Sequence, residues 1–290
     1  MSAHGFLLVD KAGGMTSHDV VAKMRKKFGT KRVGHAGTLD PMATGVLVLG
    51  IGNATRLLQY VTDGVKAYDG TIRLGSATHT DDKEGDLISQ KNPSGVSDEA
   101  IAAGLTSMVG TIKQRPSSVS AIKIDGKAAH QRIREGEDVV IPEREVTISE
   151  ISILAIDRGA DFIDIKVSVT CSAGTYIRAI ARDLGEMLEV GGHLTELRRT
   201  LVSPFSLDEC APQESVEPIS IADGIARIFP CRDLELDEMT EISFGRFLAP
   251  NPGAGIFAAL NAQGEFAALL VNKEITGKTM AAPILVAVKE

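Results

Sequence analysis

Residues 34–56 read GHAGTLDPMATGVLVLGIGNATR, and this stretch has the strongest structural signals in the chain. Its first half is polar and rich in glycine, whereas residues 46–49 form an apolar run typical of a buried β-strand. Pro41 restricts Asp40 to extended or turn conformations, and the glycines permit close backbone approach or a positive φ. The sequence therefore predicts a constrained loop that presents a carboxylate beside a hydrophobic strand. The alternative is an ordinary turn whose carboxylate only accepts bonds from nearby backbone N–H groups.

The flanking sequence alternates between patterns typical of strands and of helices. Helical spacing follows the capping residues Thr16 and Ser17 and continues to Gly29, and it recurs over residues 98–108 and 177–188. The patterns predict strands over residues 6–9, 70–74, 146–156 and 161–169. Because these elements show no regular βαβ repeat, we expect an α+β fold rather than a doubly wound α/β fold.

The last part of the chain has a different pattern. Residues 209–219 are polar and contain prolines, which indicates a connecting loop before a short helix. Short strands are predicted beyond them, over residues 255–260, 266–271 and 284–288. A length of 290 residues suggests about two domains. We expect a larger domain over residues 1–230 and a small β-rich domain over residues 231–290.

Charge is unevenly distributed along the chain. The net charge is −7, which argues against a polyanionic partner, yet the first 60 residues carry eight basic and three acidic side chains. Residues 205–290 carry six basic and thirteen acidic side chains. Because a local field attracts polyanions, the basic N-terminal segment is compatible with nucleic acid. The alternative is that its KMRKK run is a solvated helix face.

Several classes of protein and site are not supported. The three cysteines, Cys171, Cys210 and Cys231, have neither a disulfide nor a zinc-site spacing, which fits a reducing cytoplasm. No apolar stretch is long enough to span a membrane, and no secretory signal is visible. The glycine clusters lack a nucleotide-binding pattern, and the acidic run 79–86 does not match a calcium-binding loop, so we interpret that run as solvated. We expect no metal, no cofactor and a monomer.

The quoted stretch resembles the catalytic motif of the TruB family, the bacterial tRNA pseudouridine-55 synthases. Four further segments resemble motifs of the same family in the same order, and together the five extend over roughly residues 5–205. They are LLVDKAGGMTSHDVV, KAYDGTIRLGSATHTDDKEGD, RPSSVSAIKIDGKAAHQRIREG and CSAGTYIRAIARDLGEMLEVGGHLTELRRTLV. The resemblance implies a pseudouridine synthase fold with a central mixed, mostly antiparallel sheet and a small C-terminal β-rich, PUA-like domain. It also implies isomerisation of uridine 55 in the T-arm of tRNA without a cofactor.

The resemblance assigns roles to six residues of this chain. Asp40 takes the position of the catalytic aspartate, Tyr68 that of the active-site tyrosine, and Arg178 that of the arginine that pairs with the aspartate. Leu197 corresponds to an apolar residue of the uracil pocket, and Lys11 and His35 to RNA-binding positions. The chain departs from the family pattern at Ala12, Val119 and His130.

The implied reaction explains why these residue types are needed. Breaking the N1–C1′ bond and joining C5 to C1′ requires a nucleophile or base, and an aspartate can serve as either. A neighbouring guanidinium favours the charged carboxylate. Whether the aspartate attacks the base, attacks C1′ or removes a ribose proton stays open. Aromatic residues make up only 4% of the chain, so we expect one stacking ring, Tyr68, and structural roles for Tyr60 and Tyr176.

Two other functions remain as alternatives. A non-catalytic RNA-binding or RNA-folding protein would use the same basic segment. A glycosidase or nucleosidase would need a second positioned carboxylate, and the sequence singles out only one.

Overall fold

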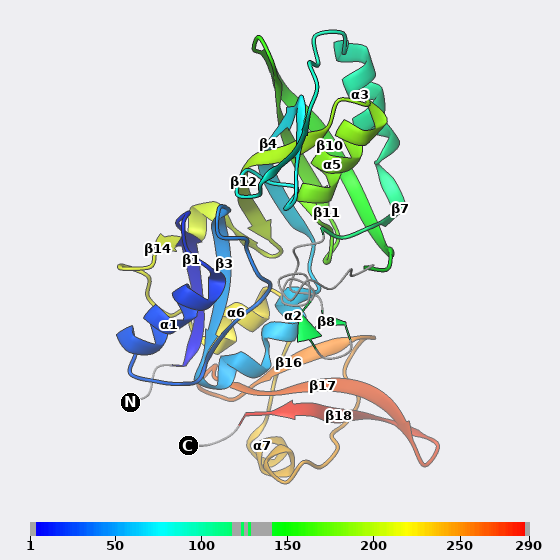
Figure 1. Cartoon of the computed structure of the whole chain (residues 1–290). Coiled ribbons are helices and arrows are strands. Elements are labelled where there is room, and N and C mark those ends of the chain that lie inside the picture. Colours follow the sequence, from blue (N-terminus) through cyan, green and yellow to red (C-terminus); the bar gives the residue numbers. More distant parts are fainter. Residues whose placement is uncertain (1–3, 118–122, 125–126, 129–140, 288–290) are drawn as a thin grey trace.

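The structure is a computed structural model that describes residues 4–117, 123–124, 127–128 and 141–287. Val119 and His130 lie outside these residues. A large mixed sheet occupies the centre of the molecule, with the order β14-β1-β3-β12-β4-β11-β10-β7, while β2 pairs with β3 and β13 with β12 (Figure 1). Its neighbours are antiparallel except for the β1–β14 and β3–β12 pairs. The α+β fold with a mostly antiparallel sheet is therefore confirmed.

The strands of this sheet come from most of the chain. They are β1 (Gly5–Lys11), β2 (Val33–His35), β3 (Thr44–Ile51), β4 (Lys66–Leu74), β7 (Gly110–Gln114), β10 (Arg144–Arg158), β11 (Ile163–Cys171), β12 (Gly192–Val202), β13 (Phe205–Ser206) and β14 (Ala211–Pro212). Short two-stranded pairs are formed by β5 (Ser76–Thr78) with β6 (Leu87–Gln90) and by β8 (Lys123–Ile124) with β9 (Lys127–Ala128).

Strand β12 joins the two halves of the sheet. It is antiparallel to β4 over its whole length but pairs with β3 only through Arg198 with Thr44 and Arg199 with Gly45. Gly45 has a φ of 97°, and a Cβ there would lie 2.2 Å from the Arg199 carbonyl oxygen. Only glycine therefore permits this close approach of β3 to β12. The loop that contains Asp40 leads directly into β3 at this joint.

Helices cover the sheet on both sides of this joint. They are α1 (Ser17–Lys27), α2 (Leu58–Thr62), α3 (Asp98–Ser107), α5 (Ile177–Met187) and α6 (Ile221–Ala226), with 3-10 turns at Gly52–Arg56 and Leu207–Glu209. A further helix, α7 (Leu236–Ser243), packs instead on the C-terminal sheet described below. Thr16 caps α1, as the sequence predicts, and the structure adds a reciprocal capping box between Thr16 and Asp19. No helix among the described residues is long and apolar enough to cross a membrane.

Two hydrophobic layers pack against the large sheet. One layer joins α1, α3 and α5 to one face of the sheet, and it includes Leu47, Ile72 and Leu184. The other layer lies against the opposite face of β1 and β3. Strands β4 and β11 turn polar residues outward on that opposite face, such as Arg73, whose guanidinium pairs with Asp164. This half-solvated arrangement is typical of antiparallel sheets.

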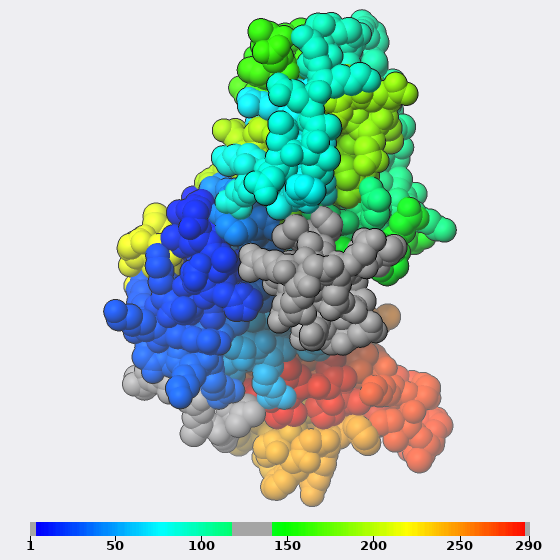
Figure 2. Space-filling view, viewed as in Figure 1, coloured from blue at the N-terminus to red at the C-terminus, as the bar shows by residue number. Residues whose placement is uncertain are grey.

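The C-terminal residues form a separate four-stranded sheet, β15-β16-β17-β18. Its strands are β15 (Cys231–Asp233), β16 (Ile256–Leu260), β17 (Phe266–Ile275) and β18 (Lys278–Val286). Figure 2 shows these residues in orange and red at one end of the molecule. Ala258, Leu269 and Leu285 share the second hydrophobic layer with Val46 and Val48, so this sheet packs on the larger one. The β-rich C-terminal part is confirmed, while the boundary at residue 230 stays a prediction.

Candidate active site

A pocket of about 530 Å³ lies where the Asp40 loop meets the large sheet and α5. This volume is in the usual range for small-molecule sites. The pocket gathers four of the six residues that the sequence singles out: Asp40, Tyr68, Arg178 and Leu197. They come from the loop before β3, from β4, from the first turn of α5 and from β12. Residues more than 150 positions apart in the sequence therefore meet at one site.

Two buried polar side chains fix the loop that presents Asp40. The Ser17 hydroxyl accepts a hydrogen bond from Leu39 N at 2.9 Å and donates one to Leu39 O at 3.2 Å. The Lys11 ammonium donates to the carbonyls of Ala43 at 2.6 Å, Ala12 at 3.0 Å and Pro41 at 3.3 Å. These contacts attach the loop to α1 on one side and to β1 on the other.

Asp40 and Arg178 form a two-pronged ion pair. Arg178 Nε lies 2.9 Å from Asp40 Oδ2, and Nη2 donates to Oδ1 at 3.1 Å. The arginine side chain is 5% exposed and the aspartate side chain 30% exposed. Such parallel contacts fix the plane of the carboxylate as well as its charge. The exposed part of the carboxylate is therefore held in a defined orientation at the pocket.

Burial and charge act in opposite directions on Asp40. Burial raises the pKa of its carboxyl above the ordinary value, and the Arg178 guanidinium opposes that rise, as does the Lys11 ammonium to a smaller extent. The negative charge of Asp82 adds to the rise in the pKa of Asp40. Arg178 is thus the main group that keeps Asp40 ionised.

Arg178 is itself held by the segment that follows β5. Its Nη1 donates to Thr80 O at 2.7 Å and to Ser117 Oγ at 3.3 Å, and it lies 3.3 Å from Asp82 Oδ2. Asp81 and Asp82 are both buried, so the interpretation of residues 79–86 as a solvated run is wrong for these two residues. Their charges are compensated inside the protein, because Asp82 pairs with Arg178 and Asp81 with Arg182.

Tyr68 and Leu197 form the apolar part of the pocket. Both side chains are buried, on neighbouring strands β4 and β12. Burial raises the pKa of the Tyr68 phenol above the ordinary value, and the Arg199 guanidinium opposes that rise. Tyr176, for which the low aromatic content predicts a structural role, lines the pocket as well and stacks under the Arg144 guanidinium.

Lys11 and His35 do not line the pocket. Lys11 is buried beneath the Asp40 loop, where desolvation lowers its pKa to about 8. The His35 ring meets the His18 ring edge-on, with centroids 5.5 Å apart. His18 lines the pocket in its place. RNA contacts by Lys11 and His35 stay predictions.

Three residues of the site are missed by the residue patterns. Ser17 reads as a helix cap, Asp82 as part of a charged loop, and Arg199 as one of two arginines in a strand that the periodicity does not predict. Each is buried and contacts the Asp40 loop or Arg178. Burial of a charged residue is decided by tertiary contacts, so no local sequence signal identifies it.

The described residues were compared with the groupings that metal ions need. Among the described residues, no three His, Cys, Asp or Glu side chains come together in a group that could hold an ion. The three cysteines are free thiols, and Cys171 is buried in the core.

Three family models match the chain in succession. TruB family pseudouridylate synthase (N terminal domain) matches residues 25–177, tRNA pseudouridylate synthase B C-terminal domain matches 178–224, and tRNA Pseudouridine synthase II, C terminal matches 229–287. A tRNA pseudouridine synthase B of Corynebacterium aurimucosum is 51% identical over 96% of this chain and 94% of its own length. The enzyme of the same name from Paenarthrobacter aurescens is 48% identical over 97% and 94%.

Solved structures show the same fold. An H/ACA ribonucleoprotein bound to a substrate RNA containing 2′-deoxyuridine gives a TM-score of 0.70 at 23% identity, over 98% of this chain and 85% of that one. The crystal structure of a Cbf5-Nop10-Gar1 complex gives 0.68 at 25% identity, over 99% and 84%. The family match covers more than half of the chain, and relatives about half identical extend over nearly all of it. The chain therefore belongs to the TruB family of pseudouridylate synthases.

Proposed function

We propose that this protein isomerises uridine 55 to pseudouridine in the T-arm of tRNA. The observation that carries the proposal is the Asp40–Arg178 ion pair at the edge of a pocket that also holds the Tyr68 ring. The relatives named tRNA pseudouridine synthase B support the choice of substrate. Because uridine 55 lies within a folded arm, the base has to leave the stack to reach a carboxylate inside a pocket.

Each side chain of the pocket has a task in this reaction. Asp40 acts as nucleophile or base while the N1–C1′ bond breaks, and Arg178 keeps it ionised and oriented. The Tyr68 ring stacks on the uracil, and Leu197 forms an apolar wall that retains the free base as it turns. C5 then bonds to C1′ and gives up its proton while N1 takes one up, and the Tyr68 phenol on the pocket wall relays the proton, because a hydroxyl can both donate and accept. No atom is gained or lost, so no cofactor is needed.

The surroundings of the pocket support further parts of the proposal. Free thiols at Cys171, Cys210 and Cys231 support a cytoplasmic location. The separate family match of residues 229–287 supports an accessory, PUA-like domain over residues 231–290.

A tritium-release assay tests the function directly. A T-arm stem-loop with [5-³H]uridine at the target position should release tritium with the wild-type protein and none with Asp40→Asn. Asp69→Asn is the matched control, because Asp69 is an exposed carboxylate on β4, one residue from Tyr68 and on the other face of the sheet. Normal release by Asp40→Asn would contradict the role of Asp40.

Two further measurements address the other functions. Free uracil among the products would indicate a glycosidase. Full rescue of a deletion strain by an inactive Asp40→Asn protein would indicate that RNA binding or folding is the main contribution.

A further inference from the structure

The pocket contains two buried cations that the proposed chemistry does not use, Lys66 and Arg199. Lys66 lies on β4 two residues before Tyr68, and Arg199 pairs with Tyr68 across the β4–β12 ladder. Their exposures are 6% and 1%, although both line the pocket. Buried charges in proteins are normally paired with an opposite charge, so two cations at one site need an explanation.

The described contacts of both cations are hydrogen bonds to carbonyl oxygens, and Asp63 is the carboxylate whose charge opposes the fall in the pKa of Lys66. Arg199 donates to three carbonyls: Val46 O at 2.8 Å, Gly37 O at 3.3 Å and Thr38 O at 3.4 Å. Lys66 donates to Thr62 O at 2.7 Å and Gly64 O at 3.0 Å. No carboxylate of a described residue forms an ion pair with either of them. Arg178, by contrast, faces two carboxylates in the same region.

The two cations face the same open space beside the Asp40 loop. A Cβ at Gly37 would be in ordinary van der Waals contact with both side chains, 3.8 Å from Arg199 Nη1 and 3.9 Å from Lys66 Cε, so both cations border the same point of the loop. Gly37 has a φ of 90°, a backbone conformation that residues other than glycine rarely adopt. The positive charge of Arg199 also contributes, after burial, to the lowered pKa of Lys66, as expected for like charges that sense each other.

Both side chains keep unused donors for a ligand. A guanidinium has five N–H groups and an ammonium three. The carbonyls described above engage three of the former and two of the latter, and the Tyr68 phenol takes a further hydrogen bond from Arg199. A phosphate between the cations would accept from both and supply the missing negative charge.

We propose that Lys66 and Arg199 form a binding site for one of the two backbone phosphates that flank the target uridine. This inference rests on the proposed function, because it assigns the nucleotide's uncharged base to the Tyr68 and Leu197 walls and its anionic backbone to the Gly37 side. The phosphate would hold the flipped nucleotide by its backbone. Rotation of the free uracil then occurs without loss of that contact.

A double-mutant cycle between protein and RNA tests the proposal. Stem-loop substrates are made with a single neutral methylphosphonate, as separated diastereomers, on the 5′ or the 3′ side of the target uridine. We expect one of these two linkages to reduce the second-order rate constant of the wild-type enzyme about 10- to 100-fold, the range for a charge-assisted hydrogen bond. In Lys66→Met and Arg199→Met the same linkage should have a smaller effect, because the interaction is already lost.

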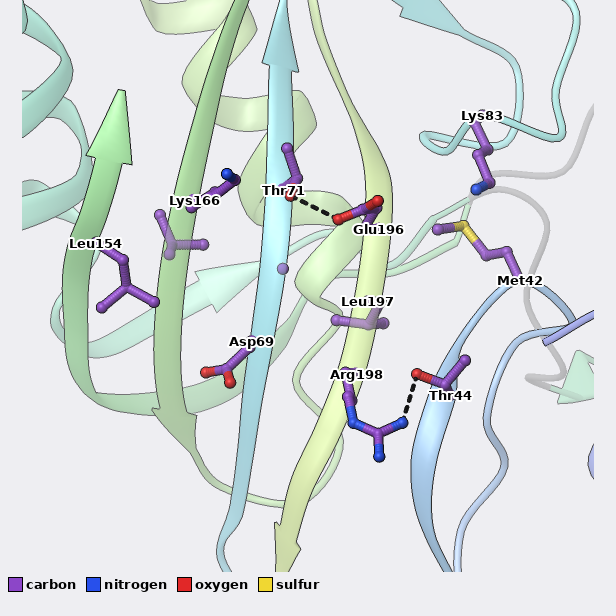
Figure 3. Close-up of a pocket in the computed structure, with 12 residues that line it drawn as sticks. Met42, Thr44, Asp69, Thr71, Lys83, Leu154, Lys166, Glu196, Leu197 and Arg198 are labelled. Carbon is purple, nitrogen blue, oxygen red and sulfur yellow. Dashed lines mark hydrogen bonds between the residues drawn. The ribbon is translucent and has the colours of Figure 1, made fainter. Parts of the chain in front are cut away.

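Arg198→Met is the matched control for both variants. Arg198 is the neighbour of Arg199 on β12 but points to the opposite face of the sheet, where it contacts Thr44 Oγ1 at 3.2 Å (Figure 3) and Asp10 at 2.8 Å. It should retain the full penalty for the neutral linkage. The salt dependence of RNA binding gives a second measurement, since each lost phosphate contact lowers the slope of log K against log salt by about 0.7–0.9.

The outcomes separate this inference from the proposed function. If the wild-type enzyme isomerises the unmodified stem-loop but is unaffected by either neutral linkage, the phosphate site does not exist. Additive effects of linkage and substitution at both flanks would show that the two cations only hold the loop. No isomerisation of the unmodified stem-loop would instead contradict the proposed function. If Arg199→Met does not fold, because three carbonyl oxygens have lost their hydrogen-bond donor, the double-mutant cycle is measured with Lys66→Met alone.

Discussion

Asp82→Asn is expected to lower stability and the rate of isomerisation by disturbing Arg178, while RNA affinity stays unchanged. The substituted amide keeps the shape of the side chain, and its oxygen can still accept from Thr80 Oγ1 at 2.5 Å and Glu84 N at 3.0 Å. What it loses is the charge that faces Arg178 Nη1 at 3.3 Å, and an amide N–H then points toward another donor. The substitution therefore perturbs one contact of one buried arginine.

The size of the effect follows from the remaining contacts of Arg178. Removing one partner of a buried ion pair usually costs 3–5 kcal/mol, and Arg178 keeps both contacts to Asp40, so we expect about 3 kcal/mol of lost stability. In a chain of this size that lowers Tm by about 5–10 °C. A shift of the guanidinium moves the Asp40 carboxylate with it, and a misplacement of about 1 Å reduces the rate about 100-fold. RNA affinity should not change, because Asp82 is buried.

Single-turnover tritium release at saturating stem-loop, filter binding and thermal unfolding measure these three effects. Asp81→Asn is the control, since Asp81 is also buried and pairs with Arg182 rather than with Arg178. It should lose stability but keep most of its rate. A rate for Asp82→Asn within about threefold of wild type would refute the reasoning, because the misplacement argued above predicts a much larger loss.

Three shorter predictions concern other parts of the site. Arg178→Met removes the main charge that lowers the pKa of Asp40. Because the reaction needs the ionised carboxylate, the acid limb of the pH–rate profile should move to higher pH. An unmoved limb would exclude Asp40 as the titrating group. Ser17→Ala leaves a buried N–H of the Asp40 loop without an acceptor, which should cost about 1–3 kcal/mol in urea unfolding and lower the single-turnover rate without changing RNA affinity. Reversing the exposed charges of Lys26 and Lys31 should weaken stem-loop binding and reduce its salt slope by about 0.7–0.9 per lost contact; an unchanged slope would place the RNA elsewhere.

The sequence predicts those parts of the fold whose contacts are local or regularly spaced. Helix α1 shows its cap at Thr16 and its apolar stripe, and β3 shows a continuous apolar run; both lie where the patterns place them. Strand β12 was not predicted, although it is central to the sheet. Its register against β4 shifts between Leu194 and Glu196 and again between Arg199 and Leu201, and such bulges disrupt the alternation by which strands are predicted.

The residues of the candidate site likewise fall into those that the sequence identifies and those that it misses. Asp40, Tyr68, Arg178 and Leu197 were identified through motifs, and the structure places all four around one pocket. Asp82 is not identified from the sequence, because its burial depends on Arg178, which lies 96 positions later in the chain. A charged residue that is neutralised by a distant partner has the same local sequence signature as a solvated one.

The late position of β12 has a consequence for synthesis of the protein on the ribosome. Asp40 and Tyr68 emerge early, on β3's loop and on β4, but the strand that lies between β3 and β4 ends only at Val202. Until then the two halves of the sheet have no shared ladder, and Arg199 cannot hold the loop of Gly37. Strands β3 and β4 cannot join into one sheet until β12 has been synthesised. Such pairing between distant parts of the chain slows folding and leaves strand edges exposed in the meantime. Premature termination before β12 is complete should therefore yield a chain that contains Asp40, Tyr68 and Arg178 but has no assembled site.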